Sequence, residues 1–293
     1  MLGSMVVDYL SRDRGLALTA TVRCGELQAR MQNVYPHVRW EVADFRGSND
    51  FSTFDGQHWI INAIGITKPL IRDDHAAEIL TAIEINSRLP HTIAREAEHR
   101  SNARVLQIAT DCVYSGAKGH YLETDVHDAL DVYGKTKSLG ECFLPNTQHL
   151  RCSIIGPEPK DFKFLIEWFR RQPPNATVNG FVNHHWNGVT TLHFAKLCKG
   201  IIETEPALSH LQHVVPSGLV TKAEMLHNFA QAYGRPDITI RDTEAKTVID
   251  RTLDTATPDA SRALWKAAGY PEPPTVTDMI LELGRYDYQG APA

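Results

Sequence analysis

The feature that most restricts the fold of this chain is the alternation of short apolar runs with helical patterns through its first half. Four runs have the length and composition of buried strands: residues 16–22, 38–42, 58–64 and 104–108. Three stretches carry apolar side chains at helical spacing: residues 3–10, 80–99 and 132–143. Because strands that alternate with helices build parallel sheets, the sequence predicts an α/β fold with a doubly wound parallel sheet of the Rossmann type.

The pattern changes after residue 150, where prolines and aromatic residues interrupt the regular alternation. Two further helices are predicted near the end of the chain, at residues 260–268 and 276–283. We therefore expect a dinucleotide-binding domain over residues 1–150. A smaller substrate-binding region is expected over residues 151–293, with part of it returning to the first domain.

Composition argues against several classes of protein. A formal net charge of -5 does not favour a broad basic surface for nucleic acid. No apolar run approaches the roughly 18 residues of a membrane span, and the N-terminus lacks the pattern of a signal peptide, so we expect a cytoplasmic protein. The cysteines show no short paired spacing, and His184 and His185 would point to opposite faces of a strand, so no metal site is predicted.

The strongest local signal for chemistry is the segment Tyr133-Gly134-Lys135-Thr136-Lys137. Residues four apart share one face of a helix, so the Lys137 ammonium can approach the Tyr133 phenol. A neighbouring cation lowers the pKa of a phenol and makes it a usable general acid near neutral pH. The spacing alone also fits a solvated pair without a function.

A hydroxyl and a carboxylate, those of Thr110 and Asp111, follow the predicted strand at 104–108. They lie at its carboxyl end, where ligands of α/β sheets bind, and Thr110 can hydrogen-bond a substrate carbonyl there. Together with Tyr133 and Lys137, this strand end resembles the short-chain dehydrogenase/reductase superfamily and, within it, the dTDP-4-dehydrorhamnose reductase family. The resemblance extends through nearly the whole chain.

The resemblance implies a catalytic trio of Thr110, Tyr133 and Lys137. Tyr133 would give a proton to the substrate carbonyl, Thr110 would orient the substrate, and Lys137 would also hold the nicotinamide ribose. The hydride would come from a dihydronicotinamide cofactor. Tyr133 and Lys137 are therefore expected to contact the cofactor as well.

The start of the chain is similar to the end of the family's glycine turn, whose amides meet a pyrophosphate at a helix N-terminus. Leu2 and Gly3 match the last part of that turn, while the first strand and the earlier glycines have no counterpart. We expect the natural protein to begin upstream of Met1 with a strand of about five or six residues.

Arg23 follows the predicted strand at 16–22, where an NAD-binding fold usually carries an acidic residue. A guanidinium suits the 2′-phosphate of NADP, so NADPH is the favoured cofactor and NADH the alternative. Arg23 as a solvated surface charge stays open. The resemblance implies further cofactor contacts, although each could also be a turn or cap residue: Asp44, Phe45, Ala63, Ile64, Gly65 and Asn86.

The substrate side is expected to use Thr110, Asp111, Arg151, His185 and Trp186. In the rhamnose enzymes the segment that matches residues 185–191 usually reads Asp-Gln, one residue, Gly, one residue, Pro-Thr. This chain has His185-Trp186 for the acid and amide, and Thr for the proline at position 190. The departure leaves the sugar undetermined.

These observations predict an NADPH-dependent reductase of a 4-keto-6-deoxy sugar linked to a nucleoside diphosphate, serving polysaccharide or nucleotide-sugar biosynthesis. An epimerase or dehydratase of the same group uses the same trio and stays open. A non-catalytic, NADP-binding regulatory subunit, like that of methionine adenosyltransferase, is the alternative from another class. The expected partners are a nucleotide sugar and, as an open alternative, a second copy of the chain in a homodimer.

Overall fold

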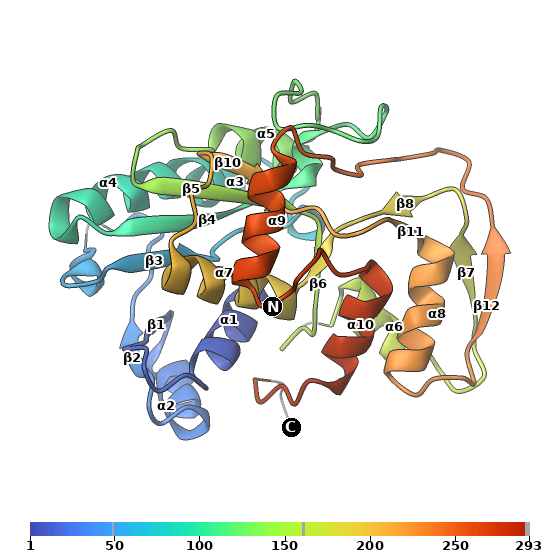
Figure 1. Cartoon of the computed structure of the whole chain (residues 1–293), viewed down its shortest axis with the longest axis horizontal. Coiled ribbons are helices and arrows are strands. Elements are labelled where there is room, and N and C mark those ends of the chain that lie inside the picture. The colour runs from blue at the N-terminus through green and yellow to red at the C-terminus, as the bar shows by residue number, and fades with distance from the viewer. Residues whose placement is uncertain (49, 160–161, 291–293) are drawn as a thin grey trace.

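The computed structural model describes residues 1–48, 50–159 and 162–290, and its first half alternates strands with helices (Figure 1). The strands of this half are β1 (Thr19–Val22), β2 (Arg39–Val42), β3 (Trp59–Asn62), β4 (Arg104–Thr110) and β5 (Thr147–Cys152). The α-helices are α1 (Leu2–Leu10), α2 (Gly25–Val34), α3 (Ala76–Ala82), α4 (Leu89–Ser101) and α5 (Val132–Leu139). Shorter helical segments are η1 (Ser52–Phe54), η2 (Lys68–Leu70), η3 (Ile83–Arg88) and η4 (Asp111–Val113).

The second half has shorter strands and five helices among its described residues. The strands are β6 (Ile154–Ile155), β7 (Thr177–Phe181), β8 (His185–Trp186), β9 (Val189–Thr190), β10 (Leu211–His213), β11 (Val220–Thr221) and β12 (Thr239–Thr243). The helices are α6 (Leu165–Arg170), α7 (Thr191–Thr204), α8 (Lys222–Ala232), α9 (Pro258–Ala267) and α10 (Val276–Arg285). The two helices predicted near the end of the chain correspond to α9 and α10.

The central sheet is parallel and has the strand order β10-β5-β4-β3. Helices flank it on both sides, so the predicted α/β fold of the Rossmann type is confirmed. Strands β1 and β2 pair in parallel with each other as a separate two-stranded sheet. The predicted boundary at residue 150 falls inside β5, and β10 from the second half completes the central sheet, so the division into two regions stays a prediction.

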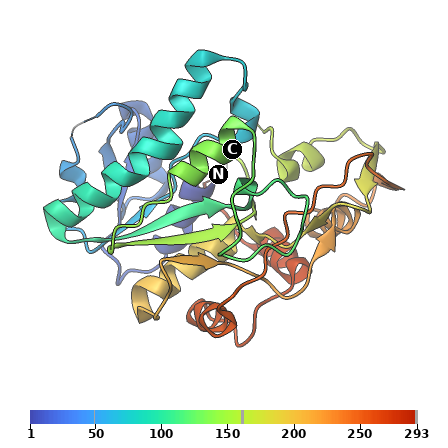
Figure 2. The same ribbon diagram turned by 90° about the horizontal axis from the view of Figure 1, so that it is seen from above.

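The two faces of the central sheet are covered by different helices (Figure 2). Successive side chains of a strand point to opposite faces, and β4 follows this rule. Val105 packs into a cluster with Leu89 and Ile93 of α4, whereas Leu106 packs into the main core with Met5 of α1 and residues of α7. The main core also includes side chains of α8 and α10, so the two halves of the chain share one hydrophobic core.

The helix predicted at 80–99 is a continuous run of α3, η3 and α4. Its middle segment, η3, has π-helical hydrogen bonding, which inserts an extra residue into the turn. Asn86 of η3 is buried and bonds the backbone of Ile66 in both directions, through Oδ1 to the amide at 2.9 Å and through Nδ2 to the carbonyl at 2.9 Å. The π-helical segment therefore holds the loop that follows β3.

Candidate active site

The carboxyl end of β4 presents a hydroxyl, a carboxylate and a thiol in sequence. Thr110 ends the strand, and its Oγ1 accepts a hydrogen bond from the Cys112 amide at 3.2 Å, which begins the turn η4. The Thr110 hydroxyl also donates to Asp111 Oδ1 at 3.3 Å. Burial raises the pKa of Asp111, while the charges of Arg251 and Lys222 act to lower it. Asp111 is thus a buried carboxyl group with cations near it.

Helix α5 brings Tyr133 to this strand end. Asp131 caps the helix by accepting a hydrogen bond from the Gly134 amide at 2.9 Å, as an N-cap residue should. Gly134 lies so close to the strand exit that a Cβ there would stand 2.5 Å from the Cys112 carbonyl oxygen. The glycine therefore lets the first turn of α5 press against η4, next to Thr110.

The Tyr133 phenol is in a different electrostatic state from the one that its spacing to Lys137 predicted. We expected a lowered pKa, but the pKa of Tyr133 is raised, chiefly by burial and then by the Cys112 thiol. Hydrogen bonding to the Thr110 hydroxyl acts in the opposite direction. The correction has a simple cause: desolvation disfavours the phenolate, and the phenol stays protonated at neutral pH.

Lys137 is buried beneath the strand end and not directed at the phenol. Its Nζ donates to the Ile108 carbonyl oxygen at 3.0 Å. Burial lowers the pKa of Lys137 to about 8, and Glu141 partly opposes this effect. An ammonium has three hydrogens to donate. Within the described part of the chain, one of them has a hydrogen-bonded acceptor.

The residues predicted to contact the pyrophosphate and the nicotinamide lie at the start of α1 and at the loop that follows β3. Gly3 of α1 lies beside Ala63, since a Cβ on Gly3 would stand 3.6 Å from the Ala63 Cβ. The start of α1 thus meets the loop after β3, which contains Ile64 and Gly65. Leu2 is buried in the core. Asn86 is bonded to the backbone of this loop and so positions it, and its contact with a cofactor stays a prediction.

The predicted adenine-side residues lie at the ends of β1 and β2. Arg23 is exposed, and its charge helps to lower the pKa of Asp44 to about 2, although Arg46 is the larger cause. Asp44 forms an ion pair with Arg46. Phe45 is buried and stacks on Phe51 with ring centroids 5.4 Å apart, and its contact with an adenine stays a prediction.

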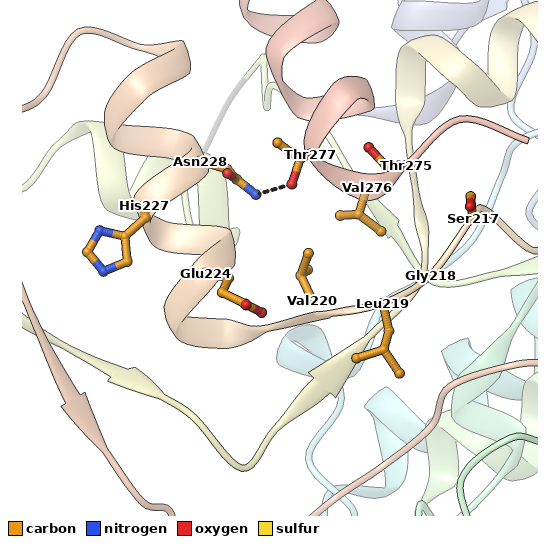
Figure 3. Close-up of a pocket in the computed structure, with 10 residues that line it drawn as sticks. All are labelled: Ser217, Gly218, Leu219, Val220, Glu224, His227, Asn228, Thr275, Val276 and Thr277. Carbon is orange, nitrogen blue, oxygen red and sulfur yellow. Dashed lines mark hydrogen bonds between the residues drawn. The ribbon is translucent and has the colours of Figure 1, made fainter.

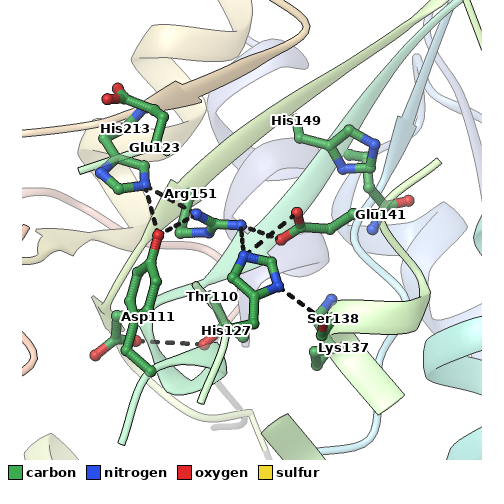
Figure 4. Close-up of polar contacts among 12 residues, drawn as sticks. Thr110, Asp111, Glu123, His127, Lys137, Ser138, Glu141, His149, Arg151 and His213 are labelled. Carbon is green, nitrogen blue, oxygen red and sulfur yellow. Dashed lines mark hydrogen bonds and ion pairs between the residues drawn. The ribbon is translucent and has the colours of Figure 1, made fainter. Parts of the chain in front are cut away.

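Arg151, for which we predicted a substrate contact, has a fully buried guanidinium at the centre of a polar network (Figure 4). Nη1 donates to the Tyr114 hydroxyl at 2.6 Å and contacts His213 Nε2 at 2.9 Å, while Nη2 contacts His127 Nε2 at 2.8 Å and pairs with Glu141. These partners come from separate segments of the chain, so Arg151 joins those segments, and its contact with a substrate stays a prediction.

The predicted substrate residues of β8 differ in exposure. His185 is half-exposed, and its Nδ1 lies 3.4 Å from Asp250 Oδ2. Trp186 is buried, and its Nε1 donates to Ser153 Oγ at 2.8 Å. The Trp186 indole N–H is therefore already bonded within the protein, and the ring can contribute a surface but no donor to a ligand.

Two cations near the strand end had no signal in the sequence. Arg251 donates from Nε to the Tyr114 carbonyl oxygen at 2.8 Å, and Lys222 begins α8. Each acts electrostatically on Asp111. Both lie more than a hundred residues beyond Asp111 and outside any spacing pattern, so tertiary structure alone brings them to it.

A hollow of about 420 Å³ lies beside these groups, lined by Asp73, Ser115, Ala129, Leu130, Asp131 and Arg251. It adjoins Asp131, the N-cap of α5, and its charged lining groups are the Arg251 guanidinium and the carboxylates of Asp73 and Asp131. A second hollow of about 570 Å³ lies between α8 and α10, where Asn228 bonds Thr277 at 3.0 Å (Figure 3). None of the predicted site residues lines the second hollow.

The parallel central sheet with helices on both sides defines an α/β protein of the Rossmann type, the fold of solved dTDP-4-dehydrorhamnose reductases. At the end of β4, Thr110 meets Tyr133 of α5. Within that class, the chain belongs to the RmlD substrate binding domain family, whose sequence model matches residues 2–162. The resemblance seen in the sequence is confirmed.

Two curated relatives match parts of the chain. A dTDP-4-dehydrorhamnose reductase of Aggregatibacter actinomycetemcomitans is 41% identical over 137 residues, which cover 45% of this chain and 44% of that protein. The methionine adenosyltransferase 2 subunit beta of Bos taurus is 25% identical over 197 residues, which cover 63% of this chain and 57% of that protein. The chain thus spans about half the length of the curated relatives it matches.

A solved structure shares the fold over nearly the whole chain. It is a dTDP-4-dehydrorhamnose reductase of Bacillus anthracis str. Ames in complex with NADP, with a TM-score of 0.65 and 16% identity. The alignment covers 91% of this chain and 97% of that one. Among the described residues, no cluster of metal-binding side chains is present. No helix in those residues combines the length and apolar character that a membrane crossing requires.

Proposed function

We propose that this protein is an NADPH-dependent reductase of a 4-keto-6-deoxy sugar attached to a nucleoside diphosphate. The observation that carries the proposal is the meeting of Thr110 and Tyr133 at the carboxyl end of β4, with the Lys137 ammonium buried beneath them. The name of the relative that is 41% identical supports the substrate class. Surface polysaccharide or nucleotide-sugar biosynthesis is the corresponding role.

In this proposal the residues act on a carbonyl placed against Thr110 and Tyr133. Thr110 turns its hydroxyl hydrogen from Asp111 to the carbonyl oxygen, and Tyr133 transfers its phenolic proton to that oxygen as the carbonyl becomes an alcohol. The raised pKa of Tyr133 keeps this proton in place before reaction. When bound, the dihydronicotinamide supplies the hydride that the carbonyl carbon accepts.

The residues present fit such a cofactor at its nicotinamide end. Lys137 donates one hydrogen to Ile108, and its remaining hydrogens suit the hydroxyls of a ribose. At the other end, Arg23 is exposed after β1 and suits a 2′-phosphate. Asp44 lies near Arg23, so the guanidinium is less free of acidic neighbours than the sequence suggested, but Arg46 already pairs with that carboxylate. The NADP held by the Bacillus anthracis relative agrees with this choice.

The test is a panel of nucleoside diphosphate sugars incubated with NADPH or NADH and followed by the absorbance of the reduced nicotinamide. Stoichiometric oxidation of NADPH with one 4-keto sugar supports the proposal. Arg23→Ala should narrow the difference in affinity between NADPH and NADH. Equal binding of both cofactors by the parent protein would count against the role of Arg23.

A regulatory subunit is the second candidate, and the similarity to methionine adenosyltransferase 2 subunit beta favours it. Such a subunit would bind NADPH without oxidising it in the presence of any nucleotide sugar. An epimerase or dehydratase would change the sugar with no net loss of NADPH. The same panel, with sugar products analysed by chromatography, separates these outcomes from a reductase.

A further inference from the structure

Lys222 occupies an unusual position for a cation. It is the first residue of α8, and a helix N-terminus carries a positive partial charge that disfavours a neighbouring ammonium. Its backbone amide donates to the His184 carbonyl oxygen at 2.9 Å, and the preceding Thr221 pairs with His185 across β11 and β8. These backbone hydrogen bonds therefore fix the position of the Lys222 Cα, from which the side chain extends.

The ring of Trp186 forms a platform for the Lys222 side chain. The Nζ atom lies 5.5 Å from the ring centroid, within the range of a cation–π contact. The ring is held by its bond to Ser153 and by Gly188, where a Cβ would come within 2.4 Å of the indole. A rigid platform limits the positions that the ammonium can take.

The Trp186 ring is connected to the carboxyl end of β4 through β5. Thr110 of β4 pairs with Cys152 of β5, and the next residue, Ser153, is the one that bonds Trp186. The charge of Lys222 acts on Asp111 and on the Cys112 thiol. A short path of contacts thus links Lys222 to Thr110, and its charge lies close enough to act on the two residues that follow Thr110.

No group in the described residues forms an ion pair with Lys222. Asp111 is the carboxyl group on which it acts, but the two make no contact within ion-pair distance in that part of the chain. Burial lowers the pKa of Lys222 to about 8. The protein thus places a partly buried cation at a helix N-terminus, near Asp111 after β4, without a paired anion among those residues.

We propose that Lys222 is a substrate-binding residue whose ammonium pairs with the diphosphate of the nucleotide sugar, a proposal that rests on the function proposed above. A lysine suits a phosphate oxygen as a point charge. Arg251 acts on the same carboxyl group as Lys222. The two cations match a group that carries about two negative charges.

The experiment measures binding of dTDP and UDP to the full chain by calorimetry with NADPH present. Lys222→Met should weaken both diphosphates by roughly tenfold to a hundredfold, the range for a lost hydrogen bond to a charged group. Lys222→Arg should keep binding within a few-fold of the parent. Thymidine and uridine, which lack phosphate, and NADPH itself should bind the variants as they bind the parent.

A matched control is Lys266→Met, which removes an exposed charge from α9. It should leave diphosphate binding unchanged. Melting curves show whether Lys222→Met folds, and Lys222→Gln replaces it if methionine disturbs the start of α8. Unchanged diphosphate affinity in the folded neutral variant, or no diphosphate binding by the parent, would overturn the proposal.

Two further comparisons distinguish a sugar carboxylate from a diphosphate as the group bound at Lys222, and the failure of this proposal from the failure of the proposed function. A loss of affinity for UDP-glucuronic acid but not for UDP-glucose or UDP would place a sugar carboxylate at Lys222 and refute the diphosphate assignment. The parent protein can fail to oxidise NADPH with every sugar of the panel while Lys222→Met loses diphosphate binding. That result supports the anion site and refutes the proposed reductase function. If the parent reduces a 4-keto sugar and Lys222→Met binds diphosphates as the parent does, the proposed anion site is refuted and the reductase function stands.

Discussion

At the residue scale, the sequence drew attention to Thr110, Tyr133 and Lys137 but could not predict the electrostatic state of their side chains. The four-residue spacing of Tyr133 and Lys137 places both on one side of α5 near Thr110. Spacing carries no information on burial, and burial raises the pKa of the phenol and lowers that of the ammonium. Likewise Arg151 lies in β5, but the segments that bury its guanidinium lie far away in the chain. Desolvation is a property of the tertiary structure.

Replacing Tyr133 by Phe should remove turnover and leave NADPH affinity nearly unchanged. The ring still packs against the strand end, but the proton donor is gone, and general acids contribute roughly a hundredfold or more to rate. Steady-state rates and a fluorescence titration with NADPH measure the two effects. Tyr233→Phe, at the C-cap of α8, is the control that removes a phenol away from the site. Turnover by Tyr133→Phe within about tenfold of the parent would contradict the assigned role.

The pKa of Lys137 predicts how NADPH binding depends on pH. The folded-state pKa is lowered to about 8, so the ammonium is charged below that pH and neutral above it. NADPH affinity should therefore fall as pH rises through about 8. Lys137→Met should bind NADPH weakly at every pH and lack this transition. Lys135→Met, an exposed neighbour on α5, serves as the control and should keep it. A transition that persists in Lys137→Met would assign it to another group.

At the element scale, the strands near 16–22, 38–42, 58–64 and 104–108 and the helices near both ends were predictable, because apolar periodicity records burial on one face. The π-helical segment was not. It depends on Asn86 bonding the loop after β3, a contact between elements twenty residues apart. The predicted helix at 132–143 ends at Leu139 for a similar reason. A Cβ on Gly140 would stand 1.9 Å from the Asn86 carbonyl oxygen, so the chain is closely packed there.

Gly134→Ala should destabilise the protein by separating α5 from η4. The new Cβ would stand 2.5 Å from both the Cys112 carbonyl oxygen and the Ala129 Cβ, and backbone has to shift to relieve the contact. Overpacking of this kind typically costs about 1–3 kcal/mol. Urea unfolding measures the free energy. Gly25→Ala, at the start of α2 with open space around it, is the control and should be neutral or slightly stabilising. Equal stability of the two variants would show that α5 is not held by this contact.

At the scale of the whole molecule, buried polar networks connect parts of the chain that the sequence presents as separate regions. The network around Arg151 joins β5, β10 and the segment after β4 (Figure 4). The family resemblance did not predict this network, which also uses His213, beyond the residues 2–162 that the family model matches. The two histidines that touch Arg151 and the nearby His149 are held neutral, since burial lowers the pKa of each. Neutral buried histidines make the stability of the fold depend on pH.

His149 allows the sign and size of that dependence to be stated. Burial lowers its folded-state pKa from 6.5 to about 4, and its Nε2 lies 2.8 Å from the Cys142 carbonyl oxygen and 3.0 Å from the Cys142 amide nitrogen. Between these two pKa values the unfolded chain binds a proton that the folded protein does not, so the free energy of unfolding falls as pH drops from about 6.5 toward 4. The contribution of His149 is on the order of 3 to 4 kcal/mol, since one pKa unit corresponds to about 1.4 kcal/mol. His149→Gln should flatten the decline over this range when urea unfolding is measured at several pH values, while His37→Gln, an exposed surface control, should not. An unchanged slope in His149→Gln would mean that the acid sensitivity comes from His127 and His213 at the Arg151 network instead.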